Sequence, residues 1–416
     1  MSNGRPPRLL LILPTTTYRA GAFVEAADRL GVEITVASEK DSAFSERETE
    51  GLLTFDFRDA KVVAGAVQAF AARHPVDAVF GVDDDTAVAA VVAAQALELP
   101  HNPMTAVEAA RDKHRQREML QAAGVPVPRF ALHRVDEDPS RLAASVEYPC
   151  VLKPLDLSAS RGVIRANDPA EFVAAHSRLL AILGAPDVVE QGRVRDRFLV
   201  EQFVPGPELA LEGLLVEGEL NTLALFDKPD PLDGPYFEET IYVAPSRAPQ
   251  VVQDALVQCA ASAARALGLE RGPVHAELRF NENGPWLIEL AARPIGGKCG
   301  QVLRFGADGA ISLEQLVLGH ALGLMEDVPP REDEAAGVMM VPIPRAGVLR
   351  EVKGVDRAHS ACGVTDVIIT VHPGQELATL PEESRYLGFI FARGERPEVV
   401  EKALRIGHRK LEVVFD

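Results

Sequence analysis

The stretch VHAELRF at residues 274–280, the turn NENG at 281–284 and, after Pro285, the stretch WLIELAARP at 286–294 predict a β-hairpin. Side chains alternate between the two faces of a strand, so one face of the first strand is polar. That face carries His275, Glu277 and Arg279. Asn-Gly is a strong hairpin signal, and the second strand is therefore expected to return antiparallel beside the first.

Two carboxylates of this hairpin, Glu277 and Glu289, are expected to lie close together. Like charges on neighbouring strands repel each other unless a cation lies between them. Mg²⁺ held by these carboxylates and by nucleotide phosphates is such a cation, and a water-facing acid pair is the alternative. Arg293 follows one short step later and offers a rigid fork for a carboxylate or an acyl phosphate. His275 is either a buried core histidine or a substrate contact, and both interpretations stay open.

A second polar segment follows the short buried strand that ends at Lys153. The loop at residues 155–163 (LDLSASRGV) contains small residues and a glycine, which let backbone N–H groups approach an anion closely. The hydroxyl groups of Ser158 and Ser160 add donors, and a lysine ammonium beside such a loop is a natural phosphate partner. The segment predicts a phosphate loop, with an ordinary hairpin turn and an edge lysine as the alternative.

A third segment is the strand at residues 198–204 (FLVEQFV), which runs into a Pro-Gly turn and then Glu208. Free backbone groups at such a strand end can hydrogen-bond an adenine edge, and a carboxylate a few residues later can hold ribose hydroxyls. The alternative is that Glu201 and Glu208 are solvated turn acids.

The N-terminal part alternates strands with helices, which predicts a Rossmann-like parallel sheet covered on both faces. The predicted strands span 9–13, 33–37 and 78–81, and the predicted helices span 21–30, 62–73 and 86–97. The loop after the first strand lacks G-x-G-x-x-G, so nothing marks a dinucleotide site. Asp83, Asp84 and Asp85 lie where a strand ends and a helix begins. We interpret them as a helix N-cap cluster, with a cation or substrate-amine site as the alternative.

Proline-rich segments divide the chain into three predicted domains, at residues 1–104, 105–328 and 329–416. A charged helix is expected from about residue 105 to 123, where Gly124 ends it. The last domain is expected to be a strand-rich α+β unit that closes with a helix at 397–407 and a strand at 411–415. The fold class is therefore a mixture of α/β and α+β.

Composition excludes several classes of protein. The 416 residues include 43 basic and 61 acidic side chains, a formal charge of −18, which argues against nucleic-acid and anionic-membrane partners. The four cysteines contain no C-x-x-C pair, which excludes a zinc ribbon and favours a reducing, cytoplasmic compartment. No apolar run approaches the ~18 residues that a membrane span needs.

Together the polar segments resemble the ATP-grasp superfamily over about residues 112–323, with Asp112-Lys113, the Lys153 loop, the 201–204 strand end and the two hairpin glutamates in the family's order. The resemblance implies ATP and Mg²⁺ as cofactors, with Mn²⁺ as an alternative ion, and Glu277 and Glu289 as metal ligands. The implied nucleotide contacts are Lys113, Lys153, Ser158, Ser160, Arg161, Gly162, Glu201, Gln202, Phe203, Val204, Glu208 and Glu239.

Within the superfamily the sequence looks most like the L-amino-acid ligases of the bacilysin-synthetase type, which make dipeptides. Those proteins end the second metal strand with Glu-x-Ala-Ala-Arg, as residues 289–293 do here. Many other members, including biotin carboxylase, have an Asn where this chain has Ala291, which disfavours a carboxylase. FDKP at 226–229 and GPYFEET at 234–240 resemble the loop of this subgroup that borders the ATP and substrate pockets. The implied catalytic residues are Arg293 and Lys153, and the implied substrate contacts are His275, Arg293, Gly296 and Gly297.

The function that this resemblance implies is ATP-dependent ligation of a carboxylate to an amine through an acyl phosphate, with release of ADP and phosphate. Small-molecule acids and amines are then the partners, and a homodimer is what the family suggests. Two alternatives stay open: an ATP-grasp carboxylase or formate-dependent transferase, and an ATP-binding protein without ligase activity.

Overall fold

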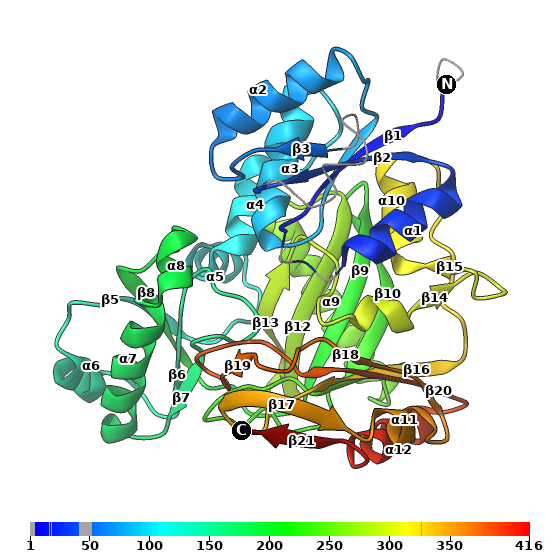
Figure 1. Cartoon of the computed structure of the whole chain (residues 1–416). Coiled ribbons are helices and arrows are strands. Elements are labelled where there is room, and N and C mark those ends of the chain that lie inside the picture. Colours follow the sequence, from blue (N-terminus) through cyan, green and yellow to red (C-terminus); the bar gives the residue numbers. More distant parts are fainter. Residues whose placement is uncertain (1–4, 16, 18, 41–51, 326) are drawn as a thin grey trace.

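A parallel sheet forms the N-terminal part of the computed structural model, which describes residues 5–15, 17, 19–40, 52–325 and 327–416 (Figure 1). Its strand order is β3-β2-β1-β4. The strands are β1 (Arg8–Ile12), β2 (Glu33–Ser38), β3 (Leu52–Thr54) and β4 (Ala78–Gly81). The helices packed around it are α1 (Ala20–Leu30), α2 (Ala60–Ala71), α3 (Asp84–Ala96) and α10 (Leu313–Ala321).

Both faces of this sheet are buried, as the continuous apolar run of β1 predicts. Leu10 and Ile12 pack in one cluster with side chains of α2 and α3. Leu9 and Leu11 pack on the opposite face, in a cluster that contains side chains of α1 and α10. The predicted parallel sheet with two covered faces is confirmed.

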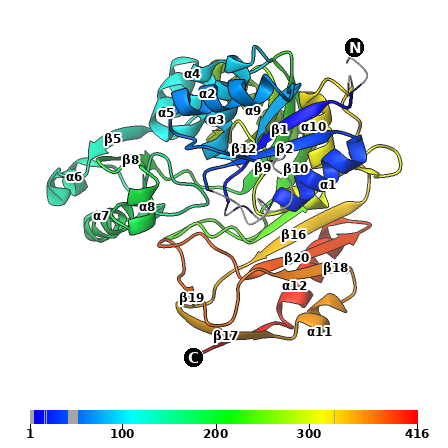
Figure 2. The same cartoon turned by 45° about the horizontal axis from the view of Figure 1, so that its top comes forward.

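A small antiparallel sheet projects to one side of the molecule, as Figure 2 shows on its left. Its strand order is β5-β8-β6-β7. The strands are β5 (Phe130–Arg134), β6 (Cys150–Lys153), β7 (Ile164–Ala166) and β8 (Arg197–Gln202), and the helices are α6 (Pro139–Ser145), α7 (Pro169–Leu183) and α8 (Pro186–Glu190). Residues 130–202 are called the lid unit below.

A large sheet, antiparallel throughout, joins the middle of the chain to its C-terminal part in the order β13-β12-β9-β10-β11-β16-β20-β18. Its strands are β9 (Glu208–Val216), β10 (Glu219–Asp227), β11 (Ile241–Ala244), β12 (Gly272–Asn281), β13 (Gly284–Ala291), β16 (Ala335–Val341), β18 (Val364–Ile369) and β20 (Gly388–Gly394). The predicted hairpin is confirmed: β12 pairs with β13, and Glu277 lies opposite Glu289. Gly284 adopts φ +98° at the turn, a conformation that favours glycine.

The charged helix expected at residues 105–123 is two helices, and the prediction of one continuous helix is wrong. They are α4 (Met104–Arg111) and α5 (Lys113–Ala122). Asp112 between them has an extended backbone, and its carboxylate accepts the N–H groups of His114 and Arg115. This N-cap satisfies two donors of α5 and turns the chain. Both helices and α9 (Gln250–Leu267) pack near the β9, β12 and β13 side of the large sheet.

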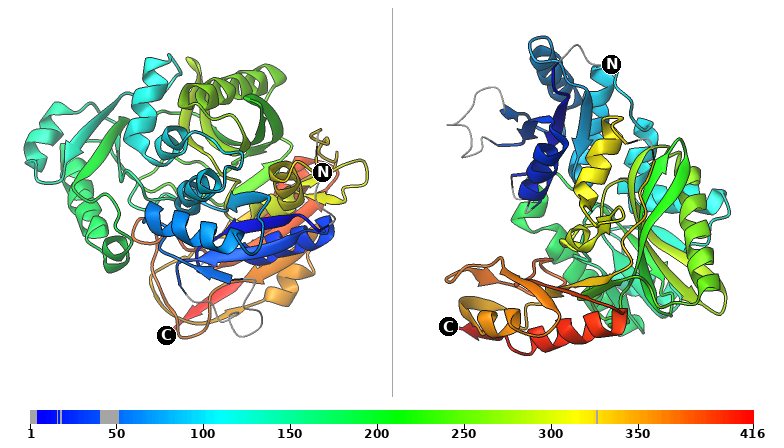
Figure 3. Two further views of the ribbon diagram at one scale, coloured as in Figure 1. Left: turned by 90° about the horizontal axis from the view of Figure 1, so that it is seen from above. Right: turned by 90° about the vertical axis from the view of Figure 1, so that its right-hand side faces the viewer.

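The C-terminal elements lie at the bottom of Figure 1, and Figure 3 places them at the end opposite the parallel sheet. They include the sheet β19-β17-β21 and helices that pack on β16, β18 and β20. Their bounds are β17 (Gly347–Lys353), α11 (Val355–His359), β19 (Glu376–Leu377), α12 (Pro397–His408) and β21 (Glu412–Phe415), and the short elements before them are η2 (Cys299–Val302), β14 (Arg304–Phe305) and β15 (Ile311–Ser312). The mixed α/β and α+β class is confirmed.

The division into three domains stays a prediction. The large sheet continues through β11 and β16, so it crosses the predicted boundary at residue 329 without interruption. Helix α10, which lies within the predicted central domain, packs on α1 and β4 of the N-terminal sheet.

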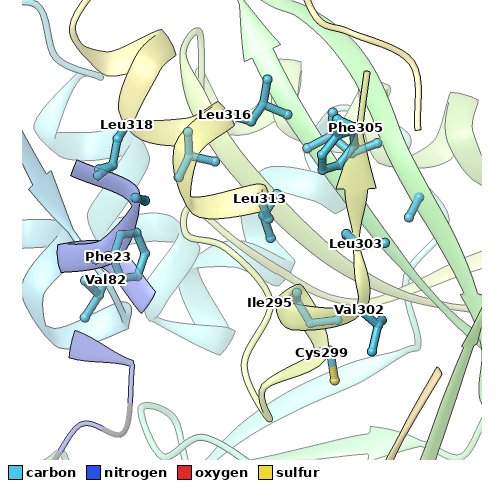
Figure 4. Close-up of a cluster of buried hydrophobic side chains, with 14 of the residues drawn as sticks. Phe23, Val82, Ile295, Cys299, Val302, Leu303, Phe305, Leu313, Leu316 and Leu318 are labelled. Carbon is cyan, nitrogen blue, oxygen red and sulfur yellow. The ribbon is translucent and has the colours of Figure 1, made fainter. Parts of the chain in front are cut away.

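One buried cluster connects the parallel sheet to the turn after β13 (Figure 4). Phe23 and Val82 from the N-terminal part pack in the same cluster as Ile295 and Cys299 of that turn. The turn is therefore held by a core that spans distant parts of the chain. In the described part of the chain, no helix has the length and apolarity that a membrane crossing requires.

Candidate active site

A cavity of about 1040 Å³ opens between the parallel sheet, the lid unit and the large sheet. Its lining contains almost every residue that the sequence nominated. These are Lys113, Lys153, Ser158, Ser160, Arg161, Glu201, Gln202, Phe203, Val204, Glu208, Glu239, His275, Glu277, Glu289, Arg293, Gly296 and Gly297. Gly162 is nominated but does not belong to the lining.

One group of buried charges surrounds Glu201, and we call it the Glu201 cluster. Its Oε1 lies 2.6 Å from Nε of Arg117 on α5, and its Oε2 lies 2.6 Å from Nζ of Lys153 on β6. Burial would raise the pKa of Glu201, but these two cations hold that pKa below its usual value. The Glu201 carboxylate is therefore charged and fully paired. Arg117 was not nominated from the sequence. Its partner Glu201 is 84 residues away, and no local pattern around Arg117 indicates that pairing.

A second group, the Lys228 cluster, has the opposite composition. The Lys228 ammonium at the end of β10 lies 2.7 Å from Glu208, 3.3 Å from Glu277 and within hydrogen-bonding distance of Glu239. Burial would lower the pKa of Lys228, but the three carboxylates raise it well above its usual value. Arg279 donates to the other oxygen of Glu208 at 2.9 Å. Lys228 lies in the FDKP stretch at residues 226–229, but no role for this lysine was predicted from the sequence.

The carboxylates of the Lys228 cluster suit a divalent cation. Oxygen atoms of Glu208, Glu239 and Glu277 lie within 4.8 Å of one another, the one such carboxylate group found among the described residues. Burial raises the pKa of Glu239 to about 7, whereas Lys228 helps hold the pKa of Glu277 well below its usual value against burial. Carboxylate oxygens are the ligands that Mg²⁺ prefers, so the donor set fits that ion.

Glu289 is directed to a different lysine. It lies opposite Glu277 across the hairpin, yet its carboxylate pairs with Nζ of Lys113 at 3.1 Å. The same ammonium donates to the carbonyl of Leu157, at the base of the predicted phosphate loop, at 2.8 Å. Metal ligation by Glu277 and Glu289 together stays a prediction.

His275 lies between two carboxylates and also borders the cavity. Its Nδ1 is 3.6 Å from the fully buried Glu212, and its Nε2 is 3.8 Å from Glu277. Burial would lower the pKa of His275, but the two carboxylates raise it. Glu212 in turn accepts the N–H of Ile295 at 3.0 Å. The histidine is buried and also lines the cavity, and a contact between His275 and a substrate stays a prediction.

The three consecutive aspartates have three different roles. Asp83 caps α3 in a capping box with Thr86, which confirms the N-cap interpretation for this residue. Asp84 accepts a hydrogen bond from Nε of Arg293 at 3.0 Å. Asp85 pairs with Arg111 and Arg193, from α4 and from the segment after α8.

The turn after β13 shapes the end of the cavity beside Arg293. Gly297 has φ +58°, and a Cβ atom there would lie 2.3 Å from Sδ of Met340 on β16. Both the backbone conformation and this close contact favour glycine at the position between the cavity and β16. Burial raises the pKa of the Cys299 thiol well above its usual value, so this cysteine remains protonated and is a poor nucleophile.

The predicted phosphate loop is strained and anchored. Ala159 and Ser160 have φ values of 52° and 57°, a region that non-glycine residues rarely adopt. The Gly162 N–H donates to the carbonyl of Pro381, and Nε of Arg161 donates to the carbonyl of Glu382 at 2.7 Å. The Arg161 guanidinium also pairs with Asp187 in α8. Nucleotide contact by Arg161 and Gly162 stays a prediction, since both already bond to protein groups.

The strand end at residues 201–204 offers fewer free backbone groups than expected. The N–H of Gln202 donates to the backbone carbonyl of Arg129, and the N–H of Phe203 donates to that of Pro149. The Val204 carbonyl accepts from the Arg279 guanidinium at 2.7 Å. Among described residues, the Val204 N–H donates to no backbone carbonyl. An adenine contact along this segment stays a prediction.

Three family models match successive parts of the chain. An ATP-grasp N-terminal domain matches residues 24–101, an ATP-grasp domain matches 146–302, and an L-amino acid ligase C-terminal domain matches 339–416. The chain belongs to the ATP-grasp superfamily. The resemblance inferred from the sequence, including the L-amino-acid-ligase type of C-terminal part, is thereby confirmed.

Individual proteins agree with this assignment. The solved L-amino acid ligase from Bacillus licheniformis is 26% identical, with a TM-score of 0.79 over 99% of both chains. An uncharacterised protein of Sinorhizobium fredii is 30% identical over 74% of this chain and 62% of its own length. Alanine–anticapsin ligase of Bacillus subtilis is 28% identical over 46% of this chain and 43% of its own. The match therefore spans less than two thirds of these two curated relatives.

Proposed function

We propose that this ATP-grasp protein is an ATP-dependent carboxylate–amine ligase that joins amino acids or amino-acid-like substrates and releases ADP and phosphate. The observation that carries the proposal is the arrangement of the cavity. Lys113 donates to the carbonyl of Leu157 in the phosphate loop, and Lys153 ends the strand before that loop. Glu277 and Glu289 lie opposite each other on β12 and β13, and these residues and Arg293 all line the one cavity.

The charges explain why a ligase needs these groups. A carboxylate is a poor electrophile, so a substrate carboxylate oxygen attacks the γ-phosphorus of ATP, the bond to ADP breaks, and an acyl phosphate forms. Lys113 and Lys153 neutralise the phosphates during this transfer. Glu277 and Glu289, with Glu239 beside Glu277, would hold Mg²⁺, which would supply further neutralisation of the transferred group.

The second half of the reaction takes place beside Arg293. An amine attacks the carbonyl carbon, the bond to phosphate breaks, and phosphate leaves while the amine loses a proton. The Arg293 guanidinium stabilises the negative charge of the tetrahedral intermediate. The lid unit excludes water, which would otherwise hydrolyse the acyl phosphate.

Similarity supports the amino-acid substrates. By their names, one relative ligates alanine and anticapsin and the solved structure is an L-amino acid ligase, and the C-terminal part matches the L-amino acid ligase family model. ATP and Mg²⁺ are the cofactors we propose, with small acids and amines as partners. A cytoplasmic location and a homodimer remain part of the proposal.

The test is ADP release with MgATP across single amino acids and amino-acid pairs, with mass spectrometry of the products. We expect one pair to yield a mass equal to the two acids less water. Bicarbonate and formate run alongside, and turnover only with a one-carbon acid would favour the carboxylase or transferase alternative. Glu289→Ala should abolish turnover, and full ADP release by that variant would contradict the proposal. ATP binding without ADP release on any mixture would favour a protein without ligase activity.

A further inference from the structure

Two consecutive carboxylates at the start of α3 contact two distant arginines. Asp84 accepts from Nε of Arg293 at 3.0 Å. Asp85 accepts from Nη1 and Nη2 of Arg193, each at 2.6 Å, in a two-bond geometry that fixes both side chains. The start of α3 therefore contacts both Arg293, which lines the cavity, and an arginine of the lid unit.

The Arg193 contact reaches the phosphate loop. Nη1 of Arg193 also donates to the carbonyl of Asp156, and the N–H of Val194 donates to the Asp156 carboxylate at 3.1 Å. Asp156 begins the turn that leads into Ser158. Oδ1 of Asp85 also accepts from Arg111 at 2.8 Å, and Arg111 lies two residues before Lys113. The groups that would hold phosphates are thus tied to Asp85 from two directions.

The first turn of α3 is fixed, so the backbone positions of Asp84 and Asp85 are held relative to each other. Asp83 and Thr86 form a capping box that fixes the first turn of the helix. Thr86 is fully buried. The Arg293 guanidinium keeps the pKa of Asp84 below its usual value although burial would raise it, so this ion pair persists.

We infer that the first turn of α3 couples closure of the lid unit to the position of Arg293, with Asp84 and Asp85 as positioning residues. Docking of Arg193 on Asp85 closes the lid against the same helix turn that presents Arg293 to the acyl phosphate. The inference rests on the proposed ligase function and adds a reason why water is excluded when the intermediate exists.

The two carboxylates then have separable effects. When Asp85 loses its charge, the lid opens and water attacks the carbonyl carbon of the acyl phosphate. The bond to phosphate breaks, and the free acid and phosphate leave with the proton of that water. ADP is then released without an amide. When Asp84 loses its charge, Arg293 shifts and amide and ADP fall together.

The first experiment measures moles of amide formed per mole of ADP released. We expect Asp85→Asn and Arg193→Gln each to lower this ratio at least several-fold, and the double variant to be no worse than either single one. Asp84→Asn should lower kcat at an unchanged ratio. The matched control is Asp136→Asn, whose pair with Arg134 lies within the lid unit and outside the cavity. An unchanged ratio in both Asp85→Asn and Arg193→Gln would overturn the inference, and Arg193→Gln serves if Asp85→Asn does not fold.

A second readout does not depend on ligase activity. Amide hydrogen exchange of residues 155–163 and 186–194 is measured with and without MgADP. We expect nucleotide to protect these segments in the wild type and in Asp136→Asn, and to protect them much less in Asp85→Asn and Arg193→Gln. Equal protection in all variants would contradict the coupling. If the wild type makes no amide but the exchange pattern follows this expectation, the ligase proposal fails while lid docking on Asp85 stands.

Discussion

Two buried charge clusters line the same cavity and differ in composition. In the Glu201 cluster one acid is paired with two bases, Arg117 and Lys153. In the Lys228 cluster one base is paired with three acids, of which Glu208 has Arg279 as a further partner. Buried charges are tolerated when they are paired, and the single carboxylate of the first cluster has a cation on each oxygen, so this cluster carries excess positive charge. The second carries excess negative charge, which a divalent cation would balance.

Because of this difference, we expect the Glu201 cluster to hold protein side chains in position and the Lys228 cluster to bind a cation. The Glu201 cluster connects α5, β6 and β8 and fixes Lys153 at the cavity wall. The Lys228 cluster leaves two carboxylates, Glu239 and Glu277, that share one ammonium. Four variants test whether the two clusters behave as their charges require.

The largest effect is expected for Glu201→Gln. The substitution leaves Arg117 and Lys153 buried without a counter-charge, and breaking a buried ion pair in this way costs about 3–5 kcal/mol. Urea unfolding without ligands measures the loss in the free energy of unfolding. A loss below about 1 kcal/mol would show that the cluster is not the paired unit that its distances indicate.

The next largest effect concerns Lys228→Met, measured with and without Mg²⁺. Three carboxylates lose their shared ammonium, so the metal-free variant should be less stable than the wild type. Mg²⁺ at ~100 times its Kd should return about 2.7 kcal/mol.

Lys153→Met is the matched control, because it removes a lysine from the Glu201 cluster. At one Mg²⁺ concentration this variant should gain no more stability than the wild type, because its carboxylates around Lys228 are unchanged, whereas Lys228→Met should gain more. Equal recovery in both lysine variants, or recovery in neither, would contradict the distinction between the clusters.

The fold was predictable where local pattern carries the information. The alternation at residues 274–280 and the Asn-Gly turn predicted that Glu277 and Glu289 face each other, and the pairing of β12 with β13 confirms it. The helix expected at 105–123 was wrong because Asp112, an ordinary helix-surface residue by pattern, serves as an N-cap.

The partners within the site were not predictable in the same way. Arg117 and Glu201 are 84 residues apart, and Asp84 and Arg293 are 209 apart. Single charged residues at such separations leave no periodic signal, because their pairing is set by how the three sheets pack. The family resemblance predicted most of the residues that line the cavity, but it predicted neither Arg117 nor the contacts of Lys228 with the three glutamates.

A smaller effect is expected from pH. Burial raises the pKa of Glu239 to about 7 in the folded protein, whereas an unfolded glutamate titrates near ~4.3. Between these values the folded state binds a proton that the unfolded state has released, so stability falls as pH rises. At roughly 1.4 kcal/mol per pKa unit, the loss is roughly 2 kcal/mol between about pH 5.5 and about pH 7. The pKa of Glu277 lies well below its usual value, so Glu277 stays charged throughout this range.

Urea unfolding of the metal-free wild type and of Glu239→Gln across this range checks the pH dependence. The wild-type stability should decline with pH, and the decline should be largely absent in the variant. The same slope in both proteins would assign the titration to another group.

The smallest effect provides the baseline for the comparison. Arg29 and Glu25 form an ion pair one helical turn apart on α1, with side chains 54% and 65% exposed. Solvent screens such a pair and both side chains lose entropy to form it, so Arg29→Ala should change the free energy of unfolding by only about 0.3–0.5 kcal/mol. Thermal and urea unfolding beside Glu201→Gln give the ratio of the two effects. A ratio near one would mean that burial does not set the strength of these pairs, and the contrast between the two clusters would then lose its physical basis.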